Sequence, residues 1–203
     1  MTITLTIANH IHHKRQDTLM LEGTFDLYGM ALPFLNKVYS PSGNATVFPE
    51  NLYNEILTYQ AKNDRTAKFT VPEGFFTGKN GQFMSGIFAD PFEDMPFDIV
   101  VTGIQQVNKL KVKSDYGRPA DAWDGPGLKA KMRIDDGGCG IASSSGSISM
   151  HPLWRKVDKV GKVMELYEGT FTFKVTYGSL YSKKGHGRGQ NQTLPFWAIR
   201  AKA

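Results

Sequence analysis

Alternation of apolar and polar residues is the strongest pattern in this chain, and it recurs in short runs. In residues 167–177, Phe171, Phe173 and Val175 alternate with threonine and lysine. A two-residue period places every second side chain on the same face of a strand. The ranges that we predict as strands are 2–7, 19–27, 68–71, 97–101, 105–113, 128–134, 167–177 and 194–199.

One segment has the period of a helix instead. Leu52, Ile56 and Tyr59 are spaced at i, i+4 and i+7, and Glu50 lies where a helix N-terminus favours negative charge. We therefore predict one short helix at about residues 50–62.

The remaining segments lack a clear period. Residues 31–39 are apolar but contain Pro33, which predicts an edge strand or a bend. Residues 72–96, 114–127 and 135–147 are rich in glycine, proline or serine and are predicted as loops.

These elements predict a mainly β fold with long loops and one short helix. An OB-like Greek-key barrel is our first expectation, and a β-sandwich is the alternative. We expect a single β domain over residues 1–203, with a subdivision near residue 95 as the other reading of the chain.

Charge separates the chain into two unequal parts. Residues 1–100 hold 7 Lys/Arg and 11 Asp/Glu, whereas residues 101–203 hold 17 Lys/Arg and 8 Asp/Glu, which gives net charges of −4 and +9. Several of the basic residues in the second part alternate, so they would share one face of a strand. Such faces are often merely solvated, but several clusters together with a basic glycine-rich loop at 183–189 indicate an anionic partner.

Other chemistry is weakly represented. His10, His12 and His13 have no cysteine or acidic cluster nearby to complete a metal site, and the single cysteine, Cys139, has no histidine at a known catalytic spacing. The adjacent carboxylates Glu93 and Asp94 would point to opposite faces of a strand. We therefore predict no catalytic residue, no metal and no cofactor, and no enzyme activity.

The start of the chain lacks the basic and apolar regions of a signal peptide, and no run is long and apolar enough to span a membrane. We expect a cytoplasmic location (host cytoplasm if the protein is viral) and no membrane partner.

Basic residues interleaved with aromatic ones are typical of proteins that bind single-stranded nucleic acid, because cations neutralise phosphates while aromatic rings stack on bases. Trp123 and Tyr181 are flanked by turn residues, so we expect them to be exposed. The residues predicted to bind nucleic acid are Lys109, Lys111, Lys113, Arg118, Trp123, Lys129, Lys131, Arg133, Tyr181, Lys183, Lys184 and Arg188. The alternative hypothesis is a structural, homo-oligomeric β protein such as a viral or phage virion component.

Overall fold

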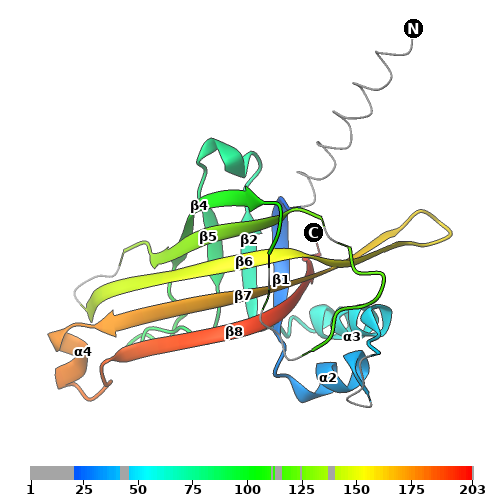
Figure 1. Ribbon diagram of the computed structural model, residues 1–203. Helices are drawn as coiled ribbons and strands as arrows, with labels where there is room; N and C mark the ends of the chain where they lie inside the picture. The colour runs from blue at the N-terminus through cyan, green and yellow to red at the C-terminus, as the bar shows by residue number, and fades with distance from the viewer. Residues whose placement is uncertain are drawn as a thin grey trace, which may run out of the picture.

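The computed structural model describes residues 21–41, 46–110, 112, 116–123, 125–136 and 140–202. Its main feature is a closed barrel of eight antiparallel strands (Figure 1). The strands are β1 (Gly23–Gly29), β2 (Ala67–Val71), β3 (Gly81–Met84), β4 (Ile99–Val107), β5 (Gly127–Ile134), β6 (Ile141–Val157), β7 (Val163–Tyr177) and β8 (Gly189–Arg200). The prediction of a mainly β barrel is confirmed, while the strand predicted at 2–7 lies outside the described residues.

The order of the strands adds a detail to the predicted barrel. Each strand pairs with the next one in the chain, and β8 closes the barrel against β1. The described strands are therefore connected in the up-and-down manner, with each strand beside its neighbour in the sequence. The barrel takes strands from both sides of residue 95.

Among the described residues, four short helical segments accompany the barrel: α2 (Pro33–Tyr39), α3 (Pro49–Ala61), the 3₁₀ helix η1 (Phe75–Thr77) and α4 (Ser179–Lys183). The helix predicted at 50–62 is confirmed as α3. The strand or bend predicted at 31–39 is wrong, because this segment forms α2. Pro33 opens that helix at a position where its missing N–H costs nothing, and Leu35 and Tyr39 are buried one turn apart.

Two predicted loops contain strands. β3 lies within residues 72–96, and β6 begins within the serine-rich segment 135–147. Neither has a strong hydrophobic pattern, and both become strands because neighbouring strands pair with them. Residues 97–101 and 105–113 were predicted as two strands, but β4 is a single strand with an irregular register between Thr102 and Gln105, where Gly103 has φ 58°.

The buried residues form two clusters. One fills the barrel interior and includes Phe25, Phe69, Phe83, Phe171 and Phe196. The other lies outside the barrel, where α2 and α3 pack against the outward side chains of four segments of the wall. We call those outward side chains the covered wall: Tyr28, Leu153, Trp154, Leu166, Trp197 and Ile199.

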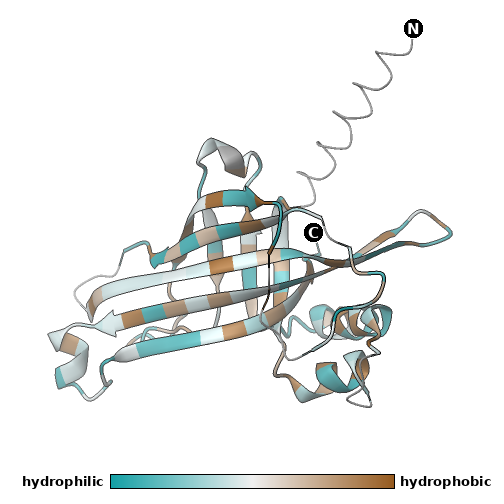
Figure 2. Cartoon of the chain, viewed as in Figure 1, coloured by the Kyte–Doolittle hydropathy of each residue, from teal (hydrophilic) through white to brown (hydrophobic). Residues whose placement is uncertain are grey.

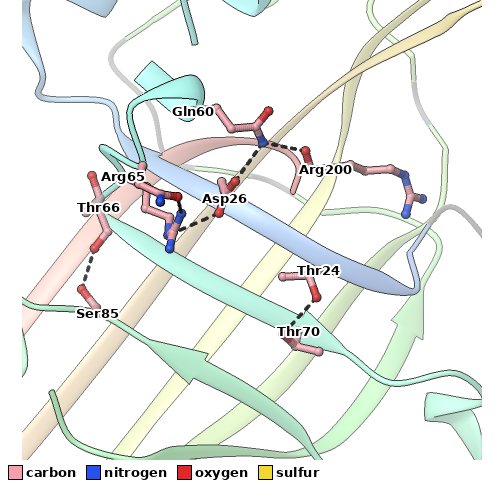
Figure 3. Close-up of polar contacts among 9 residues, drawn as sticks. Thr24, Asp26, Gln60, Arg65, Thr66, Thr70, Ser85 and Arg200 are labelled. Carbon is pink, nitrogen blue, oxygen red and sulfur yellow. Dashed lines mark hydrogen bonds and ion pairs between the residues drawn. The ribbon is translucent and has the colours of Figure 1, made fainter. Parts of the chain in front are cut away.

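A buried carboxylate ties α3 to the barrel (Figure 3). The Gln60 amide donates hydrogen bonds of 2.8 Å to Asp26 Oδ2 and to the Arg200 carbonyl oxygen. Arg65 Nε lies 3.4 Å from Asp26 Oδ1. Because Asp26 is almost completely buried, these contacts replace the water that its charge would otherwise require.

Candidate nucleic-acid interface

Along β5, and along the ends of β6, β7 and β8 that lie toward α4, the outer side of the barrel is not covered by α2 and α3. On β5, Lys129, Lys131 and Arg133 are exposed, and they alternate with buried Leu128, Ala130 and Met132 that face the interior. The alternation predicted from the sequence is thus confirmed, and the three cations share the outer face of one strand.

Strand register extends this surface across the neighbouring strands. Lys131 lies opposite Ser147, which is opposite Thr172, which is opposite Thr193. Lys174 is exposed on the same side of β7. We call this surface the basic face: Lys129, Lys131, Arg133, Ser145, Ser147, Ser149, Thr170, Thr172, Lys174, Asn191 and Thr193. The colours of Figure 2 are pale or teal over the parts of β6 and β8 that lie toward α4, in agreement with this composition.

The side chains of the basic face are short and polar between the cations. The hydroxyl oxygens of Thr172 and Thr193 lie 3.0 Å apart across β7 and β8. Arg133 is partly neutralised, because its Nη2 lies 3.5 Å from Asp135 Oδ1. Lys174 was missed by the sequence analysis, because a single lysine in an alternating strand gives no signal apart from its neighbours.

The basic loop predicted at 183–189 lies beyond the end of β7, next to α4. Lys183, Lys184 and Arg188 are all exposed. Lys184 Nζ lies 4.2 Å from the centre of the Phe92 ring, within the range of a cation–π contact. The loop is therefore at the same end of the barrel as Lys174 and Arg133, although it belongs to a separate surface.

Tyr181 does not fit the predicted site. It is buried, with 8% of its surface exposed, so the prediction that it is exposed was wrong. α4 turns its ring onto the end of the barrel, beside Tyr177 and Phe92. Its hydroxyl donates a 2.6 Å hydrogen bond to Asp90 Oδ2, and this bond, with burial, raises the pKa of Tyr181 to about 12.

Asp90 is held by more than this one hydrogen bond. Burial alone would raise the pKa of its carboxyl group, but the Tyr181 hydroxyl and the backbone amides of Phe92 and Glu93 donate to it and hold the pKa below its ordinary value. The pair therefore stabilises the loop between β3 and β4 against α4.

Arg118 and Trp123 also have structural roles. Arg118 Nε lies 2.9 Å from Oε1 of the buried Glu168, and His151 Nε2 lies 2.9 Å from the same oxygen. Trp123 is half-buried, with the Arg155 guanidinium 5.4 Å from its ring centre. Neither belongs to the basic face.

Part of the predicted lysine cluster at residues 109–113 lies outside the described residues. Lys109 is exposed after the end of β4, but Lys111 and Lys113 are not described. His10, His12, His13 and Cys139 also lie outside the described residues. Of the predicted residues, the structure brings Lys129, Lys131 and Arg133 together on one face. Lys183 ends α4, and Lys184 and Arg188 lie in the loop that follows it.

Beside α4 the end of the barrel is hollowed, with a volume of about 420 Å³. We call this feature the acidic hollow, because its rim includes several carboxylates. Its lining residues are Asp90, Glu93, Met95, Pro96, Phe97, Asp98, Ile134, Asp136, Gly140, Leu180 and Tyr181. Within the described part of the chain, no three acidic, histidine or cysteine residues are grouped so that they could hold a metal ion.

Comparisons of the chain with protein-family models, curated proteins and solved structures gave no match. No helix among the described residues combines the length and apolar character needed to cross a membrane. The case for a function therefore rests on the surfaces described above.

Proposed function

We propose that the protein binds single-stranded nucleic acid through the basic face, mainly by contacts with the phosphates. The observation that carries this proposal is the exposed row of Lys129, Lys131 and Arg133, with Lys174 on the same wall. Lysine, arginine, serine, threonine and asparagine side chains are among the groups that contact nucleic-acid phosphates. The basic face consists largely of these residue types.

The shape of the wall favours a single strand over a duplex. Duplex DNA has a persistence length of about 150 base pairs, so it resists bending around a small barrel, whereas a single strand can follow the curved wall. No aromatic residue belongs to the basic face, so base stacking does not support binding there, and we expect little dependence on sequence.

Fluorescence anisotropy with labelled oligothymidine tests this proposal. If three to four phosphates are neutralised, log K should fall with log salt with a slope of about −2 to −3, which is roughly a 20- to 60-fold loss between 50 and 200 mM salt. A duplex of the same length should bind more weakly. Absence of binding at 50 mM salt, or binding that salt does not weaken, would contradict the proposal.

A matched pair of variants locates the site. K129E/K131E reverses two cations on the basic face and should abolish most binding. K37E/K62E makes the same change in net charge on exposed positions of α2 and just after α3, and it should bind almost as wild type. Equal losses in both variants would show that only net charge matters and that the basic face is not the site.

A second proposed function is self-assembly, as in a structural protein such as a virion component. It is supported by a different surface, because the β6–β7 hairpin projects beyond the barrel and carries exposed apolar side chains at its end (Figure 1). Sedimentation velocity over a range of protein concentrations tests it, and a species that stays at the mass of one chain throughout would contradict it.

A further inference from the structure

The β6–β7 hairpin is longer than the strands beside it. β5 pairs with β6 no further than Met150, and β8 pairs with β7 only from Tyr167 onward. β6 and β7 continue to pair with each other as far as Val157 and Val163. The end of the hairpin therefore extends past the barrel, and its two strands pair there only with each other (Figure 1).

The end of the hairpin exposes an apolar cluster flanked by cations. Val157, Val160 and Val163 are 54%, 88% and 42% exposed, and Val157 lies directly opposite Val163. Lys159 and Lys162 flank Val160, and no described residue forms an ion pair with either. We call residues 157–163 the hairpin tip.

The hairpin tip has an ordered backbone, although it lies far from the core. Asp158 Oδ1 accepts hydrogen bonds from the backbone amides of Val160 (2.9 Å) and Lys162 (2.8 Å). The Asp158 amide in turn donates to the Lys162 carbonyl oxygen. A tip that is already ordered loses less conformational entropy on binding than a mobile loop does.

The acidic hollow has the complementary composition, and it lies at the other end of the barrel. Glu93 and Asp98 are exposed on its rim, and Met95 (62% exposed) and Leu180 (45% exposed) supply apolar surface. β7 runs from the hairpin tip at Val163 to Tyr177 near the hollow, a distance of about 45 Å at the usual rise per residue. One molecule therefore presents an apolar, basic projection at one end and an apolar, acidic depression at the other.

We propose that the hairpin tip of one copy docks in the acidic hollow of a second copy. This inference rests on the second proposed function, self-assembly, and is independent of nucleic-acid binding. Contact between two tips would oppose lysines, and contact between two hollows would oppose carboxylates, so symmetric pairing of either end is disfavoured. Tip-to-hollow contact is heterologous, and it generates a ring if the rotation closes and a filament if it does not.

Charge reversal at each end, followed by mixing, tests the proposal. K159E/K162E makes the tip acidic, and E93K/D98K makes the hollow basic. The association of each variant alone should be at least about tenfold weaker than that of wild type, because its two ends then repel each other. An equimolar mixture should assemble again, since the acidic tip of one variant meets the basic hollow of the other.

Sedimentation velocity at low salt measures these outcomes, with K37E/K62E as the control that changes net charge without changing either end. The control should assemble as wild type does. If wild type assembles but the tip and hollow variants also do, self-assembly stands and this interface is wrong. If wild type remains monomeric at every concentration, both the inference and the second proposed function fail.

A lipid surface is the other occupant that a cationic, apolar tip would suit. Flotation of wild type with vesicles of phosphatidylcholine and phosphatidylserine distinguishes it. Monomeric protein that floats with the vesicles, and that loses flotation in Val160→Asp, would overturn docking between copies in favour of lipid. Assembly without flotation would support the proposal.

Discussion

The covered wall and the basic face share the strands β6, β7 and β8, yet their outward side chains differ in kind. On β7 the outward Leu166 is buried under the helices, whereas outward Lys174, eight residues later, is exposed. On β8, Trp197 is 1% exposed, whereas Thr193 is exposed. On β7 the inward residues, such as Tyr167 and Phe171, are buried along both stretches, so only the outward pattern changes along that strand.

This difference shows that the polarity of the outward side chains depends on whether helices cover that part of the barrel. A strand buried on both faces loses its alternation, and a strand with one solvated face keeps it. The helices α2 and α3 stabilise the covered wall by burying its apolar side chains. The strands under the basic face have no such cover, so their stability comes from their inward side chains. Truncation of an outward side chain should therefore be severe in the covered wall and mild in the basic face.

The largest effect is expected from Trp197→Ala in the covered wall. Removing a fully buried tryptophan should lower the free energy of unfolding by about 3–5 kcal/mol. Thr172→Ala on the basic face should change it by less than about 0.5 kcal/mol. Urea unfolding followed by circular dichroism measures both, and losses of equal size would contradict the distinction between the two regions.

A smaller loss is expected where α3 is tied to the barrel. Gln60→Met removes the amide that donates to Asp26 and to the Arg200 carbonyl, leaving a buried carboxylate with one donor fewer. The expected cost is about 2–3 kcal/mol. Gln105→Met makes the same change at an exposed position of β4 and should cost less than about 0.5 kcal/mol. A small loss for Gln60→Met would mean that Arg65 suffices to stabilise Asp26.

Features set by local sequence could be predicted, whereas features set by distant contacts could not. The alternation in β5 and β7 predicted both their strands and their faces, because a two-residue period is a local property. The burial of Tyr181 could not be predicted, because its partner Asp90 lies 91 residues earlier. The serine-rich start of β6 gave no apolar pattern, because Gly146 lies on the inward side against Phe173, which already fills that space.

Alkaline pH should test how strongly burial in the two apolar clusters protects tyrosines from ionisation. Burial raises the pKa of Tyr28, Tyr39 and Tyr167 far above that of a free phenol. The unfolded chain ionises near pH 10 while these phenols stay protonated in the fold, so stability is full below pH 10 and falls as pH rises above it.

Unfolding midpoints in urea at pH 8, 9, 10 and 11 measure this fall, and absorbance at 295 nm follows phenolate formation. Tyr181, at a pKa of about 12, should ionise before the three more deeply held phenols. Stability that does not change between pH 8 and 11 would contradict the burial of these side chains.

The smallest effect on stability is expected from Lys131→Met in the centre of the basic face. Its side chain is exposed and no packing holds it, so the free energy of unfolding should change by less than about 0.5 kcal/mol. The slope of log K against log salt for oligothymidine should become about 0.7 less negative, because one phosphate contact is lost. A loss of stability above about 1.5 kcal/mol with an unchanged slope would show that Lys131 is structural, and the contrast between the covered wall and the basic face would then fail at its centre.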